Sequence, residues 1–529
     1  MHCSCIRQTA LPNTSRLMAD VLYHPDRTAA FYRHPVRDLA AFRDAAAEIH
    51  FPDDRRAALI AALQVQNAPG NSRKSHSLER LAQPGTVAVM TGQQVGLFSG
   101  PAYTIYKALH AVRLAQWLTE NGVSAVPVFW LATEDHDFAE VAHVWVFDAA
   151  HRPVKLTVER SNGARPVGDV ELGAVPIQEL REALRDLPYA EEVVALVEEA
   201  YRPGQTMGGA FGALLRKLLA RFDILYVDPM LPQFRQLAAP TLQAAVEASP
   251  QLTAGILQRD RELAAAGYHA QVHVEEQTSL FFLLENGKRL TLRRNGRDFT
   301  ANGRRFSTEE LAARAADLSP NALLRPVVQD GMLPTVAYIG GPAETAYLAQ
   351  SETIYRTILG RMPVAVPRAG FTILDQRSAK RMEWYGLGLP DFFQGEDALR
   401  ERIARKLTPP TLAATIREAT GTVESALARL RRELEHFDPT LVKALGNSER
   451  KIRYQFSRIE GKTGREAMRR DQRAVNDAAS LYGLIYPERH LQERLYSILP
   501  FLAKHGFDLI DHLYGTIELD CADHRLMVV

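Results

Sequence analysis

The chain has only three cysteines in 529 residues, Cys3, Cys5 and Cys521, and all three lie near its two ends. So few thiols in these positions cannot form a disulfide framework, and they do not suggest a cysteine-rich zinc site. Sparse cysteine is typical of proteins in a reducing compartment. We therefore expect a cytoplasmic protein without zinc.

Long apolar runs are also missing. No stretch approaches the ~18 consecutive apolar residues of a membrane span, and the first residues lack the apolar core of a signal peptide. The net charge is only +1, so the chain as a whole has no preference for nucleic acid or for acidic surfaces. The composition is that of an ordinary globular protein, and the length predicts roughly three or four structural units.

The first half of the chain alternates short β-rich runs with longer amphipathic runs, which predicts an α/β fold with a parallel sheet. A helix over residues 101–122 is expected between the first two strands, with Pro101 in its first position and Gly122 at its end. The expected strands are 86–90, 125–132, 224–228, 335–340 and 363–367.

Two segments interrupt this alternation, at residues 151–205 and 240–330, and both are interpreted as insertions in the sheet. The second insertion contains residues of alternating polarity and Asn-Gly steps at 286–287 and 295–296. Asn-Gly is the favoured pair for a two-residue hairpin turn. This insertion therefore predicts a small antiparallel meander.

Charged helical sequence begins near residue 396. Apolar residues recur there at spacings of four and three, break at Asp438-Pro439, and then resume, which predicts two antiparallel helices forming an arm. Aromatic residues are too sparse in the arm for a nucleic-acid surface, so its basic residues are interpreted as a solvated face. We expect the arm to mediate a homodimer. The repeating residues are Leu412, Ile416, Ala419, Val423, Ala426, Leu430, Leu441, Leu445, Ile452, Phe456 and Ile459.

The candidate site follows from the strand ends, because ligands of an open parallel sheet bind beyond the carboxyl ends of its strands. The first strand is followed by "TGQQVGLFSGP", which matches neither common phosphate-binding fingerprint. Its glycines would nevertheless allow close approach by an anion, and the following helix would turn its positive end to this loop. The candidate binding residues are Thr91, Gly92, Gln93, Gln94, Gly96 and Gly100.

The helix after this loop carries Tyr103, Tyr106, Lys107 and His110 on one face. Two interpretations are open for that face. Lys107 would offset negative charge at the loop, with Tyr103 beside the ligand, or the rings would pack on the sheet while Lys107 extends to water.

The second strand is followed by "TEDHD", which places Glu134, Asp135, His136 and Asp137 together. The acids would serve as Mg²⁺ ligands, or a carboxylate would hold His136 as a general base. A helix N-cap explains one or two acids, but not three acids and a histidine, so we favour a functional role.

Later strands end in further candidates. Glu344 follows "YIGGP" and would hold an amine, although a tight turn explains the glycines. A local cap or ion pair is at least as good an explanation for Asp228 and Arg368. The candidate binding residues from these strands are Asp228, Tyr338, Gly340, Gly341 and Arg368.

Four segments together resemble one family: "TGQQVGLFSGPAYTIYK", "PVFWLATEDHDFAEV", "LRPVVQDGMLPTVAYIGGPAETAYLAQ" and "YPERHLQERLYS". In this order they are similar to the BshC family, the cysteine-adding enzymes of bacillithiol synthesis. The resemblance starts near residue 17 and leaves residues 1–15 as an N-terminal extension. It implies a Rossmann-like core over 16–390, a coiled-coil domain over 391–480 used for dimerisation, and a C-terminal segment, 481–529, that packs back on the core.

The resemblance also implies an activity, the joining of the carboxyl group of cysteine to the amine of glucosaminyl-malate, with ATP as the activator. In this reading Asp135 and His136 orient and deprotonate the amine, Lys107 offsets negative charge, and Glu344 holds an amine. Glu134 or Asp137 would hold Mg²⁺. Whether activation passes through an adenylate or an acyl phosphate is open.

Two other functions remain as alternatives. One is a nucleotidyl- or glycosyl-transferring enzyme on the same kind of sheet, and the other is a nucleotide-binding coiled-coil interaction protein. Nucleic-acid binding by the basic arm ranks last.

Overall fold

The structure is a computed structural model that describes residues 2–67, 75–159 and 165–529. Residue 1 of the expected extension and residues 160–164 of the first expected insertion lie outside the described residues. The chain forms two compact units. The first comprises 1–149, 154–373 and 493–527, and the second comprises 150–153, 374–492 and 528–529.

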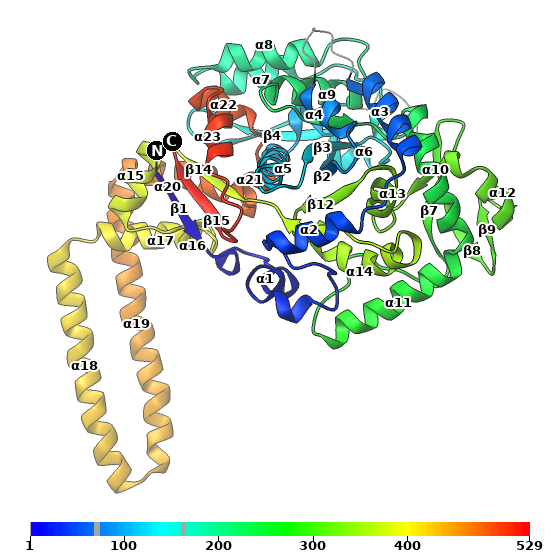
Figure 1. The fold of residues 1–529 in the computed structure, drawn as a ribbon. Coiled ribbons are helices and arrows are strands. Elements are labelled where there is room, and N and C mark those ends of the chain that lie inside the picture. Colours follow the sequence, from blue (N-terminus) through cyan, green and yellow to red (C-terminus); the bar gives the residue numbers. More distant parts are fainter. Residues whose placement is uncertain (1, 68–74, 160–164) are drawn as a thin grey trace. The chain divides into compact units, whose positions relative to one another are not determined.

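A five-stranded parallel sheet forms the centre of the first unit (Figure 1). Its strand order is β13-β12-β2-β3-β6, and all five predicted strands are confirmed in it. β2 and β3 pair in continuous register from Val87 opposite Ala125 to Gln94 opposite Ala132. The strands are β2 (Val87–Gln94), β3 (Ala125–Ala132), β6 (Leu225–Val227), β12 (Thr335–Gly340) and β13 (Val364–Pro367).

The alternation of side chains along β2 supplies two separate hydrophobic cores. Val87 and Val89 belong to one core, together with apolar residues of the helix α5 (Tyr103–Glu120). Ala88 and Met90 belong to the other, with residues of α10 (Pro232–Glu247) and α14 (Pro342–Ile358). Both faces of the sheet are therefore covered, as a parallel sheet requires.

The helix α5 begins two residues later than predicted. Pro101 lies in a turn, where the next residue, Ala102, donates its backbone N–H to the carbonyl of Tyr496. At the other end the prediction holds, because Gly122 adopts φ 86° just after the helix.

The expected meander is confirmed as an antiparallel sheet of order β10-β9-β8-β7-β11. Asn286 and Gly287 have φ of 53° and 71° at the first turn, and the sequence also has an unrecognised turn at Asn302-Gly303. The strands are β7 (Thr278–Glu285), β8 (Lys288–Asn295), β9 (Asp298–Ala301), β10 (Arg304–Phe306) and β11 (Leu318–Pro320).

Two smaller sheets complete the strands. Residues 2–6, expected to belong to an extension, form an edge strand of a sheet of order β1-β15-β14. A two-stranded sheet pairs β4 with β5. These strands are β1 (His2–Ile6), β4 (His143–Phe147), β5 (Pro153–Thr157), β14 (Phe371–Leu374) and β15 (His524–Val528).

Further helices surround the sheets. They are α1 (Arg16–Tyr23), α2 (Leu39–Ala47), α3 (Asp53–Asn67), α4 (His76–Leu81), α6 (Phe138–Val141), α7 (Ile177–Leu184), α8 (Ala190–Ala200), α9 (Met207–Leu218), α11 (Ser249–Ala265), α12 (Thr308–Ala313), α13 (Arg325–Met332), α21 (Gln492–Leu495), α22 (Leu499–His505) and α23 (Leu509–Gly515). Among the described residues, no helix combines the length and the apolar character needed to cross a membrane.

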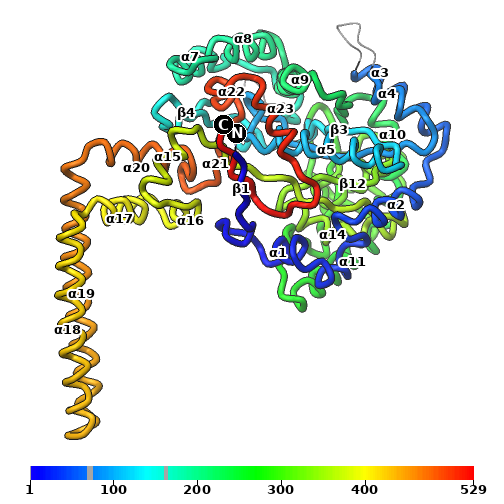
Figure 2. The backbone as a smooth tube through the Cα atoms, turned by 60° about the vertical axis from the view of Figure 1, so that its left-hand side comes forward, coloured from blue at the N-terminus to red at the C-terminus, as the bar shows by residue number. Residues whose placement is uncertain are grey.

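The second unit is helical and contains the predicted arm. Its two long helices, α18 (Pro410–Phe437) and α19 (Thr440–Arg470), lie side by side and antiparallel in both views, with the expected break at Asp438 and Pro439 (Figures 1 and 2). The other helices of this unit are α15 (Gln376–Tyr385), α16 (Leu389–Phe392), α17 (Glu396–Leu407) and α20 (Gln472–Ile485).

The apolar repeat of the arm divides into two faces. Ile416, Val423, Ile452 and Phe456 are half-buried and Leu445 is buried, as residues between two helices should be. The other members of the repeat are exposed, and the partly covered positions of α18 instead include Thr420, Leu427 and Leu434. The exposed members are Leu412, Ala419, Ala426, Leu430, Leu441 and Ile459.

Candidate active site

A cavity of about 360 Å³ opens at the carboxyl ends of β2, β3 and β12, within the first unit. This is the edge of the sheet at which the sequence predicted a site. Helix α13 and the start of α14 supply the rest of its wall. The lining residues are Gly92, Gln93, Gln94, Tyr103, Trp130, Ala132, Asp135, Glu140, Ala322, Arg325, Gln329, Tyr338, Gly341, Pro342, Ala343, Glu344, Tyr347, Arg368 and Arg494.

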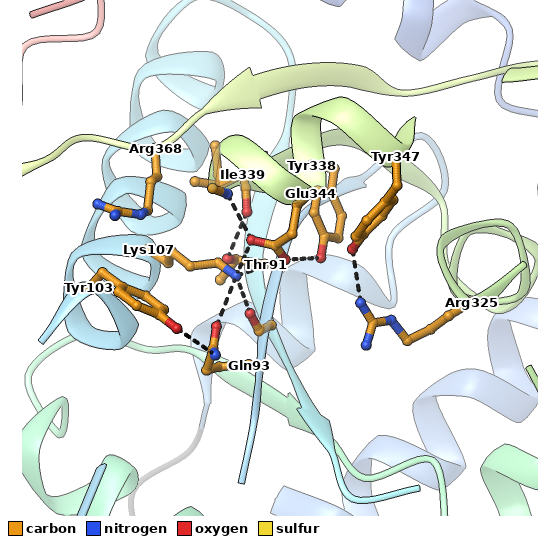
Figure 3. A network of polar contacts seen from close by, with 12 residues as sticks. Thr91, Gln93, Tyr103, Lys107, Arg325, Tyr338, Ile339, Glu344, Tyr347 and Arg368 are labelled. Atoms are coloured by element: carbon orange, nitrogen blue, oxygen red, sulfur yellow. Dashed lines mark hydrogen bonds and ion pairs between the residues drawn. The ribbon is translucent and has the colours of Figure 1, made fainter. Parts of the chain in front are cut away.

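A buried ion pair between Lys107 and Glu344 lies at the floor of this site (Figure 3). Lys107 Nζ donates to Glu344 Oε1 at 2.8 Å and Oε2 at 2.7 Å, and to Gln93 Oε1 at 3.3 Å. Nζ also donates to the carbonyl of Gly92. The lysine side chain is 0% exposed, so the interpretation in which it extends to water is wrong.

Glu344 joins three elements of the site. It accepts from the hydroxyl of Tyr338 on β12 at 2.8 Å and from the backbone N–H of Gly341 at 2.7 Å, in addition to Lys107 of α5. Burial raises the pKa of Glu344, but the charge of Lys107 and these hydrogen bonds outweigh burial and hold the pKa below its usual value. Burial lowers the pKa of Lys107, and Glu344 opposes that shift.

A second buried ion pair positions Arg368. Its Nη1 and Nη2 donate to Glu493 Oε2 and Oε1 at 2.9 and 2.6 Å, and the guanidinium carbon lies 4.9 Å from the ring centre of Tyr103. Burial opposes the charge of Arg368, but Glu493 outweighs it and the pKa of Arg368 is raised. This two-point geometry fixes the plane of the guanidinium at the cavity wall.

The four residues of "EDHD" separate in the structure. Glu134 is buried and binds Arg235 Nη1 at 3.0 Å and Ser319 Oγ at 2.8 Å. Asp137 caps α6 by accepting from the N–H of Glu140 at 3.2 Å. Among the described residues, no group of three or more His, Cys, Asp or Glu side chains is arranged to hold a metal ion. These two carboxylates therefore have partners other than a metal.

Asp135 is the member of that sequence that lines the cavity. It accepts from Gln94 Nε2 at 2.6 Å and from the N–H of His136 at 2.7 Å. Burial raises the pKa of Asp135, but these hydrogen bonds and the charge of Arg289 lower it further, below its usual value. The imidazole of His136 lies 3.6 Å from Asp135 and accepts at Nδ1 from Arg289 at 3.0 Å.

A smaller cavity of about 190 Å³ adjoins the first and shares Trp130, Ala132, Asp135, Ala322 and Arg325 with it. The meander closes this side. Arg289 of β8 stacks over the ring of Phe282 at 3.9 Å and donates to the carbonyl of Pro320 at 2.8 Å.

Several predicted residues lie outside the larger cavity. Thr91 donates to the carbonyl of Ile339, a contact between neighbouring strands. Asp228 accepts from Thr133 Oγ1 and Met230 N, and burial raises its pKa. Gly340 and His136 are also absent from the lining.

The glycines of the opening loop serve the loop itself. A Cβ on Gly96 would lie 3.2 Å from the Cα of Gly100, so the loop closes by bringing these two residues together. Gly100 has φ 63° and ψ −159°, a conformation that strongly favours glycine. Neither residue lines the larger cavity.

Sequence reasoning missed Glu140, Arg325, Gln329, Tyr347 and Arg494, which also line the cavity. Arg325 and Gln329 belong to the helix before β12, and Arg325 donates to the hydroxyl of Tyr347 at 2.8 Å. Strand-end reasoning does not extend to a helix that precedes a strand. The only available signal was "LRPVVQDG", where a proline marks a helix start beside an arginine.

The cavity wall carries both signs of charge. The guanidinium groups belong to Arg325, Arg368 and Arg494, and the carboxylates belong to Asp135, Glu140 and Glu344. Such a wall suits a ligand that presents an amine and an anionic group, because each finds an opposite charge.

Comparison with known proteins agrees with this architecture. The model of the bacillithiol biosynthesis BshC N-terminal Rossmann-like domain matches residues 1–369, and that of the BshC C-terminal coiled-coil domain matches residues 371–529. Three curated relatives carry the name cysteine ligase BshC. The protein of Solibacter usitatus is 66% identical over 100% of both chains, that of Koribacter versatilis 38% over 99% of both, and that of Chlorobaculum tepidum 32% over 90% of this chain and 89% of its own. This chain therefore belongs to the bacillithiol biosynthesis BshC family.

Proposed function

We propose that the protein is a ligase that joins the carboxyl group of cysteine to the amine of glucosaminyl-malate, the last step of bacillithiol biosynthesis. The observation that carries the proposal is the cavity of mixed charge at the carboxyl ends of β2, β3 and β12. Both reactants combine an amine with carboxylate groups, and this wall offers acids and guanidinium groups to match. Family membership supplies the choice of reactants.

Amide formation needs an activated carboxyl group, because an amine does not displace oxide from a free acid at a useful rate. ATP is the proposed co-substrate that supplies this activation. Arg368 and Arg494 would hold its phosphate groups, since guanidinium groups bind phosphate oxygens through paired hydrogen bonds. No step is assigned to a protein-bound magnesium ion, because Glu134 and Asp137 have other partners.

The acceptor amine must lose a proton before or during attack. Asp135 faces the cavity with a lowered pKa, so it is ionised at neutral pH and would orient the amine. His136, 3.6 Å from Asp135, would accept the proton. Glu344 is held by Lys107 and Tyr338, and it would offer a fixed negative charge to an amine on the opposite wall.

The test is a defined reaction of the purified protein with cysteine, glucosaminyl-malate and ATP, followed by mass spectrometry. Bacillithiol should form, and the nucleotide product distinguishes the routes, since AMP indicates an adenylate and ADP an acyl phosphate. Failure to form the amide with any nucleoside triphosphate would exclude a stand-alone ligase. Consumption of a nucleotide sugar instead would support a transferase.

A matched pair of variants tests the site. Asp135→Asn should lower kcat by about a hundredfold or more, the usual contribution of a positioned acid–base group. Asp137→Asn is two residues away, caps α6 and does not line the cavity, so its kcat should stay near that of the parent. Equal losses in both variants would argue that "EDHD" acts only through local structure.

We also propose that the protein is a homodimer through its arm. The support is the exposed apolar face of α18 and α19, where Leu430 is 47% and Ile459 52% exposed. Leu412 and Leu441 add to it at 42% and 38%. Burial of such residues against a second copy would remove apolar surface from water.

A further inference from the structure

The three cysteines of the chain meet at one place, although they come from its opposite ends. Cys5 lies on β1, and Cys521 lies three residues before β15, the strand that neighbours β1 in the sheet. Their Sγ atoms are 3.8 Å apart across 516 residues of sequence. Both residues belong to the first compact unit.

The pair is placed for covalent bonding. Both thiols are free, Cys5 is exposed and Cys521 partly so. A disulfide has a sulfur–sulfur length of about 2.05 Å, so the two atoms must approach by less than 2 Å. The strand that carries Cys5 can supply this movement, because it is an edge strand in which His2 to Cys5 are exposed and Ile6 is only partly covered.

We infer that Cys5 and Cys521 form a reversible disulfide by exchange with a low-molecular-weight disulfide. The thiolate of one cysteine attacks the reagent, releases one small thiol and forms a mixed disulfide. The second cysteine displaces the other small thiol and closes the Cys5–Cys521 bond. In total, two protein thiols and one small disulfide give one protein disulfide and two small thiols, and the two thiol protons end on the products.

Cys3 remains as the third thiol of the cluster. It lies two residues from Cys5 on the same strand, and its Sγ contacts the carbonyl of Ser4 at 3.9 Å. It is also close enough to feel the charge of Cys521, which contributes to its raised pKa after burial, the larger cause. Cys3 is therefore the internal competitor that the experiment must separate from Cys5.

The bond would connect the first strand to a strand that supports the candidate site. On β15, the ring of His524 lies 2.9 Å from Thr372 Oγ1. A Cβ placed on Gly370 would meet both His524 Nδ1 at 2.7 Å and Glu493 Oε2 at 3.2 Å, so these two side chains lie against the same backbone. Glu493 is the partner of Arg368. The disulfide would thus fasten β1 beside the segment that holds this ion pair.

The test uses reduced full-length protein and glutathione disulfide as the oxidant, with thiols counted by alkylation and bonds located by peptide mapping without reductant. Partial burial, followed by the hydrogen bond to Cys521, raises the pKa of Cys5 to about 11, so mildly alkaline buffer is used to speed exchange. The native protein should form a Cys5–Cys521 bond and keep one alkylatable thiol, Cys3. Urea-unfolded protein should need about a hundredfold more oxidant, because its two thiols are not held together.

Variants and a structural readout complete the test. Cys3→Ser should form the same bond to the same extent, and Cys5→Ser should abolish it. Oxidation should slow hydrogen exchange of the amides of residues 2–6, and reductant should reverse that effect. Three alkylatable thiols after oxidation, separate mixed disulfides on each cysteine, a Cys3–Cys521 bond, or unchanged exchange in β1 would each overturn the inference. None of these outcomes depends on ligase activity.

Discussion

The ammonium group of Lys107 lies 2.7 and 2.8 Å from the two carboxylate oxygens of Glu344, with the lysine side chain fully buried. Removing one partner of a buried pair leaves an uncompensated charge and costs about 3–5 kcal/mol. Lys107→Met and Glu344→Gln should each destabilise the first unit by an amount of this order. The double variant should lose clearly less than the sum, as measured by urea unfolding. Additive losses would argue against direct coupling of the two groups.

Arg368 should not tolerate lysine. Lysine cannot reproduce the two parallel hydrogen bonds to Glu493, so Arg368→Lys should lower ligation activity at least about tenfold. Arg356→Lys is the matched control, because Arg356 is 64% exposed and its contact with Glu352 is 3.9 Å long. Steady-state kinetics compare the two variants, and an active Arg368→Lys enzyme would show that the geometry of this pair is unimportant.

Asp330 makes stability depend on pH. Burial raises its pKa from 3.8 to about 6, with the charge of Arg361 opposing burial. The folded protein therefore holds this proton to higher pH than the unfolded chain, and stability falls as pH rises from about 4 to about 6. Asparagine has no such proton and still accepts from the hydroxyl of Tyr355.

The stability of Asp330→Asn relative to the parent should accordingly rise by about 3 kcal/mol between pH 4 and pH 7. Urea unfolding at several pH values measures this difference. The exposed residue Asp186 provides the control variant Asp186→Asn, for which the difference should stay flat. A flat difference for Asp330→Asn as well would mean that Asp330 titrates normally.

Gly92 should not accept a side chain. A Cβ there would lie 2.8 Å from both the Cβ and the carbonyl oxygen of Trp130 on the neighbouring strand. Gly92→Ala should cost about 1–3 kcal/mol through overpacking. Gly421→Ala, in an exposed part of α18 where a Cβ meets nothing within 4 Å, should instead gain about 0.5–1 kcal/mol. Thermal unfolding of both variants checks the contrast, which a stable Gly92→Ala protein would contradict.

The exposed face of the arm gives the test of the proposed dimer. Leu412→Glu combined with Leu430→Glu places charges on that face and should produce monomers in sedimentation velocity. Ser425→Glu adds a charge to an exposed position of the same helix that is not part of the apolar repeat, and should leave the dimer intact. A parent protein that sediments as a monomer, or a double variant that stays dimeric, would exclude this interface.

The positions of the strands and the edge used for the site were predictable from sequence. Parallel strands are short apolar runs with glycine, proline or charge at their ends, and β2, β3 and β12 all show this pattern. The break of the arm at Pro439 was equally visible. These features depend on local composition, which a single sequence contains.

The partners of individual side chains were not predictable, because they depend on residues distant in sequence. The fate of Lys107 is set by Glu344, 237 residues later, and that of Arg368 by Glu493, 125 residues later. The arm shows the same limit at a smaller scale. Two apolar stripes share one helix, and only the position of α19 determines that Val423 is covered while Leu430 is exposed.

Gln329 gives the cavity a means of rejecting ligands. Its side-chain oxygen is buried in the wall, and within the described part of the chain no donor reaches it. Water lost from such an oxygen on ligand binding must be replaced by an N–H or O–H of the ligand, or the complex bears the full cost of a bare acceptor. An analogue that is identical in shape but lacks this hydrogen would be refused even though it fits, because discrimination of this kind comes from a hydrogen bond left unmade.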